Sequence, residues 1–301
     1  MPRQLLKVKP SLDSEKVFDN PKVTYGLATT RDELEQAFEL VWQGYIKVGL
    51  HPDDKAGKRV TKYHLDPRSK VFIASVKEEK EVDGKLRTVS RVIGTLTVAH
   101  DGCLGLPADE VCKAEIDELR QNNPNQVEIM GFVCNNDGED KRVFLKLFHL
   151  AYEYCELANI TGVVVSLTQR HIGFYRRFFG FKPLGKLSEY TMGNGTPVQV
   201  HHVSVKEGRA LFNKRTSTLC EDDEWCYFLE TKAMCLLQNS LKTKPWSKDR
   251  INHFMTSCSS LQSQIDIDAA NSLKAEYRRY GVELALPCLH LDNNVNNMMQ
   301  V

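Results

Sequence analysis

The sequence lacks a long apolar run, a signal-peptide core and an excess of charge of either sign. No stretch of about 18 apolar residues occurs, which excludes a helix that spans a membrane. The 40 Lys and Arg residues are balanced by 39 Asp and Glu residues, so the chain has no strongly basic surface of the kind that binds nucleic acid. Residues 1–16 contain no apolar core. We therefore expect a cytoplasmic protein without a nucleic-acid partner.

Closely spaced cysteines are also absent. The nine cysteines are scattered and never form a Cys-x-x-Cys pair, which excludes a zinc finger and a disulfide framework. His201 and His202 are adjacent in a predicted strand, so their rings point to opposite faces and do not share a metal. We expect no metal site.

What is present is a chain of average composition, with 42% hydrophobic and 26% charged residues, long enough to bury a substantial core. Residues 1–22 are polar, contain Pro10 and Pro21, and predict a flexible lead-in. Residues 23–206 alternate strand and helix patterns, which indicates one α/β domain with a mixed sheet. Residues 207–301 lose the β-rich runs and predict a helical C-terminal extension.

Apolar periodicity and turn residues locate the expected elements. Strands are expected at 23–28, 71–76, 92–98, 127–134 and 163–167, then from 181 onward, with a last hairpin from 190–192 to 198–205. Thr30 and Glu33 have the spacing of a capping box and open a helix that ends at Gly49. Further helices are expected at 107–120, 143–154, 170–179, 222–241, 248–255 and 261–280.

The strongest local signal follows the buried strand 163–167. Residues 171–183 (HIGFYRRFFGFKP) predict a short helix that carries Tyr175, then Gly-Phe at the start of another strand. This order resembles the GNAT acyltransferase superfamily, in which two strands splay apart and a helix tyrosine protonates the departing thiolate. The resemblance implies that role for Tyr175, although Gly180 follows it by five residues where the superfamily usually has four. The alternative is that Tyr175 packs in the core.

The glycine-rich phosphate loop of acetyl-CoA-using GNAT enzymes is missing. Residues 134–140 (CNNDGED) contain three carboxylates, which would repel a pyrophosphate. Either CoA binds differently, or the donor presents only a pantetheine arm, as acyl carrier protein does. An acidic carrier protein requires a basic docking surface, and the alternative is an ordinary solvated face. The candidates are Lys141, Arg142, Lys146, Arg170, Arg176, Arg177, Lys182 and Lys186.

Several ordered motifs narrow the resemblance. They are Trp42-x2-Tyr45 with Gly49-Leu50, residues 66–70 (DPRSK), 93–98 (IGTLTV), 101–102 (DG), 105–109 (GLPAD), 127–129 (VEI) and 174–181 (FYRRFFGF). Together they resemble the FeeM-type long-chain N-acyl amino acid synthases, relatives of the acyl-homoserine-lactone synthases, over about residues 25–205. The resemblance implies transfer of a fatty acyl chain from acyl carrier protein to the α-amino group of an amino acid. The acyl-phosphopantetheine is then a co-substrate and no cofactor is needed. Peripheral membrane contact and the oligomeric state stay open.

Glu128 matches the carboxylate that this family carries on its central strand. The ammonium of an amino acid must lose a proton before it attacks a thioester, and burial raises the pKa of a carboxyl toward the neutral range. The alternative is a Glu128 paired with Arg or Lys on the solvent side. The relatives usually place a basic residue three positions later, where this chain has Met130-Gly131, so another arginine must hold the substrate carboxylate.

Other residues have expected roles in the same reaction. A backbone N–H near Phe132, Val133 and Cys134 is expected to stabilise the oxyanion. Cys134 is expected to be structural, because GNAT chemistry is direct attack without an acyl-enzyme. His171 is expected to be a cap or surface residue.

Phe38, Trp42 and Tyr45 form one apolar stripe on the first helix. They line either the core or an acyl tunnel.

Two other functions stay open at this point. One is an acyl-CoA-dependent GNAT enzyme that acts on another amine, and the other is an inactive GNAT-fold module that binds acyl chains or carrier protein.

Overall fold

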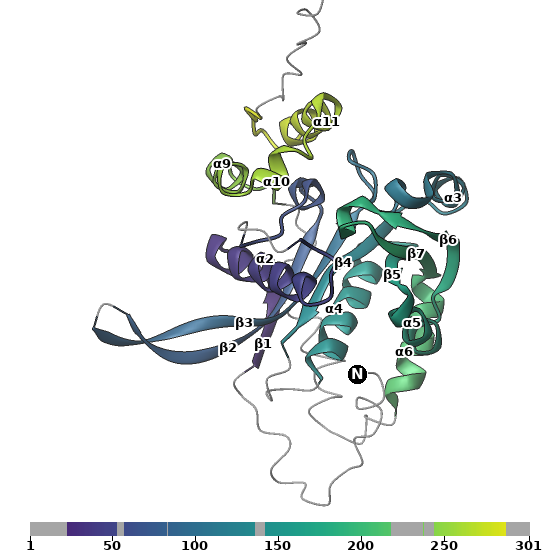
Figure 1. The fold of residues 1–301 in the computed structure, drawn as a ribbon, viewed down its shortest axis with the longest axis horizontal. Coiled ribbons are helices and arrows are strands. Elements are labelled where there is room, and N and C mark those ends of the chain that lie inside the picture. The colour runs from purple at the N-terminus through teal and green to yellow at the C-terminus, as the bar shows by residue number, and fades with distance from the viewer. Residues whose placement is uncertain are drawn as a thin grey trace, which may run out of the picture.

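Seven strands form one mixed sheet in the order β1-β2-β3-β4-β5-β7-β6 (Figure 1). The computed structural model describes residues 23–52, 57–82, 84–135, 142–217, 237 and 244–286. All neighbouring strands are antiparallel except β4 and β5, which are parallel. The predicted α/β architecture with a mixed sheet is confirmed. The strands are β1 (Val23–Leu27), β2 (Lys70–Val82), β3 (Lys85–His100), β4 (Gln126–Cys134), β5 (Gly162–Thr168), β6 (Lys182–Tyr190) and β7 (Thr196–Ser204).

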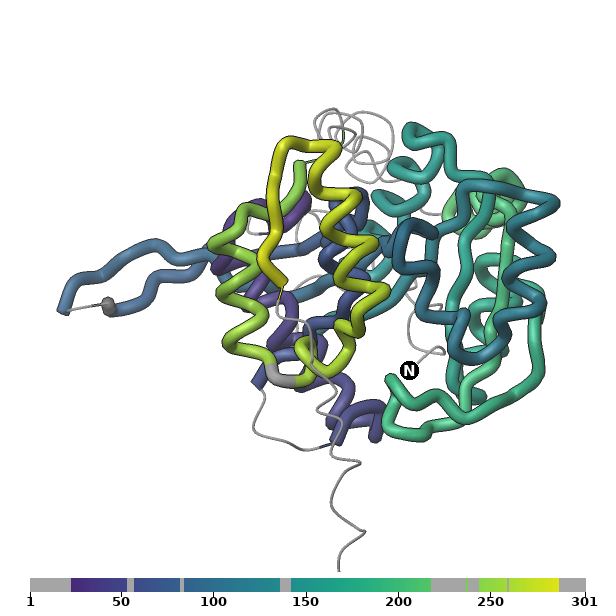
Figure 2. Tube along the Cα trace, turned by 90° about the horizontal axis from the view of Figure 1, so that it is seen from above, coloured from purple at the N-terminus to yellow at the C-terminus, as the bar shows by residue number. Residues whose placement is uncertain are grey.

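Helices cover both faces of the sheet, as the two perpendicular views show (Figures 1 and 2). Side chains alternate along β2, so Phe72 and Ala74 pack with α4 while Val71 and Ile73 pack with α2. The α2–α3 face is therefore distinct from the α4–α5–α6 face. The helices are α2 (Arg31–Ile46), α3 (Asp109–Asn122), α4 (Val143–Leu157), α5 (Gln169–Phe179) and α6 (Val205–Thr216), with short 3-10 turns η1 (Lys62–Leu65) and η2 (Thr191–Gly193).

Helix α2 begins with the predicted capping box. Glu33 N–H donates to the Thr30 hydroxyl (3.2 Å), and Thr30 N–H donates to the Glu33 carboxylate (2.9 Å). The helix ends at Ile46, three residues before the predicted Gly49. The expected strand 181 onward and the first arm of the last hairpin are one strand, β6, and helix α6 was not predicted.

The C-terminal helices pack against α2 and share its core. Phe254 of α9 (Lys248–Ser257) and Leu273 of α11 (Ile267–Arg278) are buried in the same apolar cluster as Phe38. The helix expected at 261–280 is interrupted, because α10 (Ser259–Gln262) ends early and the Asp266 carboxylate caps α11 by accepting from Ala269 N–H (2.7 Å). The expected lead-in 1–22 and helix 222–241 lie outside the described residues, apart from Leu237. No helix of the described part of the chain is long and apolar enough to cross a membrane.

Strands β4 and β5 separate after a short paired segment. They pair only from Gln126 to Glu128 on β4 and from Gly162 to Val164 on β5, although both strands continue beyond. The remaining part of β4 therefore faces a gap on that side.

A β-bulge interrupts β4 inside this gap. Met130 is opposite Thr97 and Val133 is opposite Thr95, so two β4 residues face a single residue of β3. Gly131 in the bulge has φ +58°, in the left-handed region that favours glycine. The extra residue turns Phe132 toward α4, where its ring stacks on Phe144 at 4.5 Å.

Candidate active site

Glu128 lies at the last paired position of β4 and β5, where the gap begins. Its side chain is buried, and its residue is only 1% exposed. One carboxylate oxygen accepts a hydrogen bond from Ala108 N–H (2.7 Å), and the other accepts from the Ser166 hydroxyl (2.8 Å). Among the described residues no Arg or Lys forms an ion pair with Glu128. The alternative of a solvent-side ion pair is therefore wrong.

Burial raises the pKa of Glu128 to about 7, and the nearby Asp109 carboxylate adds to the rise. The hydrogen bonds from Ser166 and Ala108 stabilise the ionised form and oppose this shift. A carboxyl with a pKa near 7 is about half ionised at neutral pH, so it can accept a proton and release it again. Glu128 has the electrostatic character of a general base.

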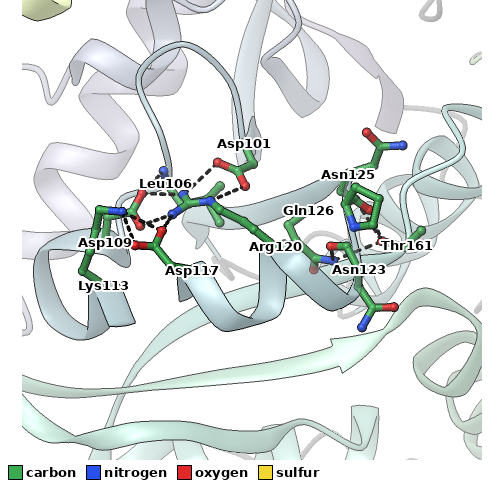
Figure 3. Close-up of polar contacts among 11 residues, drawn as sticks. Asp101, Leu106, Asp109, Lys113, Asp117, Arg120, Asn123, Asn125, Gln126 and Thr161 are labelled. Carbon is green, nitrogen blue, oxygen red and sulfur yellow. Dashed lines mark hydrogen bonds and ion pairs between the residues drawn. The ribbon is translucent and has the colours of Figure 1, made fainter. Parts of the chain in front are cut away.

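The loop that supplies Ala108 is fixed by Arg120 (Figure 3). The Arg120 guanidinium donates to both oxygens of Asp101 (2.7 and 2.8 Å) and of Asp109 (2.7 and 2.6 Å). Asp109 also accepts from Leu106 N–H (2.7 Å). Because Asp101 directly follows β3 and Asp109 begins α3, this network sets where the N-terminus of α3 meets Glu128.

Tyr175 lies on the opposite face of the sheet. Its ring packs in the aromatic core, 6.1 Å from Phe148 and 5.5 Å from Phe179 between centroids. Burial raises the pKa of its phenol, and the nearby Tyr45 and Cys134 add to the rise. Tyr175 is thus a core residue in the vicinity of Tyr45 and Cys134, and its hydroxyl stays protonated at neutral pH.

Phe132, Val133 and Cys134 are partly exposed on the part of β4 that no longer pairs with β5. Burial raises the pKa of the Cys134 thiol to about 12, so it is protonated at neutral pH and is a poor nucleophile. Helix α2 approaches this segment closely, since a Cβ on Gly44 would lie 2.7 Å from Val133.

The apolar stripe of α2 divides between core and site. Phe38 is 1% exposed and packs on His64 (4.6 Å) and Phe254 (5.4 Å), so its assignment to acyl binding is corrected to the core. Trp42 is partly exposed on the same helix. Tyr45 lies beside Gly131 of the bulge, and its phenol oxygen interacts with the Gly131 backbone.

Some of the basic residues predicted to dock the carrier protein are exposed, and one of them is buried. Arg170, Arg176 and Arg177 are exposed on α5 and form no ion pair with any described carboxylate. Lys146 is 4% exposed, with its ammonium 5.4 Å from the Tyr25 ring, so its assignment to a docking surface is wrong. Arg142 precedes α4, and Lys141 with residues 136–140 lies outside the described residues.

A solvent-open hollow of about 760 Å³ lies along η1 and the start of α3. Tyr63, Asp109, Glu110 and Met192 are among its lining residues. Burial raises the pKa of Tyr63, and the Glu128 charge adds to the rise. The hollow lies close to the carboxylate, because its lining residue Asp109 follows Ala108, whose N–H donates to Glu128 (2.7 Å). The described residues contain no group of three or more His, Cys, Asp or Glu side chains suited to a metal ion.

Two parts of this site escaped sequence reasoning. Ser166 was detectable in principle, because it is the single polar residue within the apolar strand 163–167. Arg120 has no comparable signal, since its partners are distant in sequence and meet only in the folded chain.

Comparison with known proteins supplies the family. The chain matches the family described as N-acyl amino acid synthase FeeM over residues 36–204, and no curated protein matches it. The solved structure of FeeM, an N-acyl amino acid synthase from uncultured soil microbes, is 20% identical, covers 63% of this chain and 94% of its own, and has a TM-score of 0.51.

Two further structures are more distant. A CoA-dependent acyl-homoserine lactone synthase, BjaI, is 16% identical with a TM-score of 0.43, covering 64% of this chain and 90% of its own. A GNAT-family acetyltransferase from Streptococcus pneumoniae is 10% identical with a TM-score of 0.40, covering 61% and 99%. The family match spans more than half of the chain. The chain therefore belongs to the FeeM family of N-acyl amino acid synthases, and it is an N-acyltransferase that shares the fold of the FeeM structure.

Proposed function

We propose that this enzyme transfers a long acyl chain from acyl carrier protein to the α-amino group of an amino acid. The observation that carries the proposal is Glu128, a buried carboxyl with a pKa of about 7 at the point where β4 and β5 separate. An amine that acts on a thioester must be deprotonated near neutral pH, and Glu128 is suited to that task.

The acceptor and the leaving group use opposite faces of the sheet. The amine approaches from the α2–α3 face, and Glu128 takes its proton directly or through water. The nitrogen attacks the thioester carbonyl, and backbone N–H groups near Phe132 to Cys134 stabilise the oxyanion. The C–S bond then breaks, and the pantetheine thiolate takes a proton from Tyr175 on the α5 face. The nitrogen loses its second proton at the same time, and that proton restores the Tyr175 hydroxyl through water.

The choice of donor rests on charge. Arg170, Arg176 and Arg177 form an exposed basic surface on α5 without carboxylate partners among the described residues. Residues 134–140 carry three carboxylates where CoA-using relatives have a glycine-rich loop. Both features favour an acidic carrier protein over the pyrophosphate of CoA.

The direct test supplies one acyl chain on acyl carrier protein or on CoA, together with the twenty amino acids, and identifies products by mass spectrometry. We expect an N-acyl amino acid, formed faster from the carrier protein. Faster reaction from acyl-CoA would favour a CoA-dependent enzyme. Binding of the donor without any product would favour an inactive binding module.

A charge reversal on α5 tests the docking surface. We expect Arg176→Glu with Arg177→Glu to lower kcat/KM for acyl carrier protein by about tenfold at low salt, because the surface would repel an acidic partner. The loss should shrink as salt is added. The matched control is Lys85→Glu with Arg87→Glu on the exposed β2–β3 ribbon, which projects away from α5 (Figure 1). Equal losses in both variants would contradict docking at α5.

A further inference from the structure

An amino acid acceptor presents a carboxylate beside the amine that reacts, and the structure must offer a cation for it. On the central strand Glu128 is followed by Ile129, Met130 and Gly131, none of which is a cation. This inference rests on the proposed function and concerns which residue takes over that task.

Arg59 is held in the connection between α2 and η1. Its backbone N–H donates to the Phe38 carbonyl (3.0 Å), and its guanidinium lies 5.1 Å from the centroid of the Tyr45 ring. Its Nη2 donates to the Met192 carbonyl in η2, on the turn between β6 and β7. The guanidinium therefore bridges two elements on the α2–α3 face.

The guanidinium of Arg59 has no carboxylate partner among the described residues, and it is partly buried. Arg120 differs, because three aspartates surround it. Arg68 also differs, because Asp66 pairs with it at 3.1 Å. The Nε and Nη1 hydrogens of Arg59 have no acceptor among the residues that the structure describes. A guanidinium with free donors is suited to binding a carboxylate.

The charges of Arg59 and Glu128 both affect the pKa of two tyrosines, Tyr45 and Tyr190. The pKa of Tyr45 is raised by burial, the Arg59 charge opposes that rise, and the Glu128 charge adds to it. The pKa of Tyr190 is raised in the same way, with the same two charges acting in the same directions. The contacts of the two side chains also lead to one place. Arg59 donates to Met192, which lines the hollow, and Glu128 accepts from Ala108, whose neighbour Asp109 lines it too.

We propose that Arg59 binds the α-carboxylate of the acceptor amino acid while Glu128 takes the proton from its ammonium. The two charged groups of an amino acid are attached to one carbon, so a cation and a base that adjoin the same hollow can hold both at once. Arg59 is then a determinant of specificity for amino acids over amines that lack a carboxylate.

The test compares the amino acid that gives most product with its α-carboxamide, both at saturating acyl donor. We expect the wild type to prefer the acid. Arg59→Gln should raise KM for the acid by about 10-fold to 100-fold with kcat changed much less, and should leave KM for the amide unchanged. Arg59→Lys, which keeps the charge but loses the planar fork, should recover part of the preference.

The matched control is Arg91→Gln, since Arg91 is paired with Glu78 on the ribbon, and it should behave as wild type toward both acceptors. An Arg59→Gln variant that loses activity on acid and amide equally would overturn the inference and indicate a structural role. If that variant does not fold, the folded Arg59→Lys variant decides, and an unchanged acid preference there together with wild-type KM overturns it. A wild type that acylates acid and amide equally overturns the inference alone, whereas one that acylates neither overturns the proposed function.

Discussion

The two faces of the sheet differ in chemistry around the gap between β4 and β5. On the α2–α3 face, Thr97 and Glu128 are buried and Ser166 is partly buried. All three side chains are polar and hydrogen-bonded. On the α4–α5 face the rings of Phe148 and Phe179 stack at 4.0 Å within a continuous aromatic cluster. One strand thus separates a polar space, where we propose that the charged acceptor binds, from an apolar environment, where we propose that the thiol leaves.

The largest expected effect comes from removing the base on the polar face. Glu128→Gln should lower kcat/KM at pH 7 by about 100-fold or more, because the amide cannot take a proton. In the wild type, activity should rise with pH through about 7, because Glu128 must be ionised to act, and this step should be absent in the variant. Rate measurements from pH 5.5 to 8.5 check both points. A wild-type profile in Glu128→Gln would contradict its role as base.

A measurement of folding stability is the control for this variant. The activity that depends on Glu128 should rise with pH, whereas its contribution to stability should fall. The folded-state pKa of Glu128, about 7, lies above its ordinary value of 4.5, so its contribution to stability is complete below about pH 4.5 and is lost as pH rises through 7. The variant has no such loss. Thermal unfolding should therefore show Glu128→Gln gaining stability relative to wild type between pH 5 and 8, and a variant that unfolds at every pH would make its inactivity uninformative about the base.

A smaller effect is expected from the apolar face. Tyr175→Phe keeps the aromatic ring and removes only the hydroxyl, so it should lower kcat by about tenfold if the phenol protonates the thiolate. The loss should disappear with a thioester whose thiol is more acidic, since such a leaving group needs no proton. A packing role alone predicts unchanged kcat with both thioesters, and Phe174→Leu, in the same cluster, is the packing control.

The contrast between the faces was only partly predictable from sequence. The period-two pattern of β4 and the resemblance located Glu128, and the Thr30–Glu33 spacing located the start of α2. Lys146 was misplaced because α4 is buried on most of its circumference, which a single amphipathic stripe does not reveal.

Contacts between distant segments were beyond reach. Arg59 reaches η2 through a bond to Met192, more than a hundred residues away, and no local pattern encodes that meeting. The strand separation was implied by the resemblance, but the position of the bulge is set by the φ of one glycine.

The smallest expected effect comes from the bulge at Gly131. A substitution there tests whether the bulge contributes to the reaction. Gly131→Ala should cost about 1 kcal/mol of unfolding free energy, because an L side chain at φ +58° is strained, while its Cβ finds only ordinary contact with Val41 at 3.4 Å. If the bulge orients the N–H groups of Phe132 to Cys134, kcat should also fall several-fold. Gly84→Ala at the ribbon tip, with φ +68° and open space, should cost similar stability in urea denaturation and leave kcat unchanged. Equal kcat in both variants would mean that the bulge shapes the strand without contributing to the reaction.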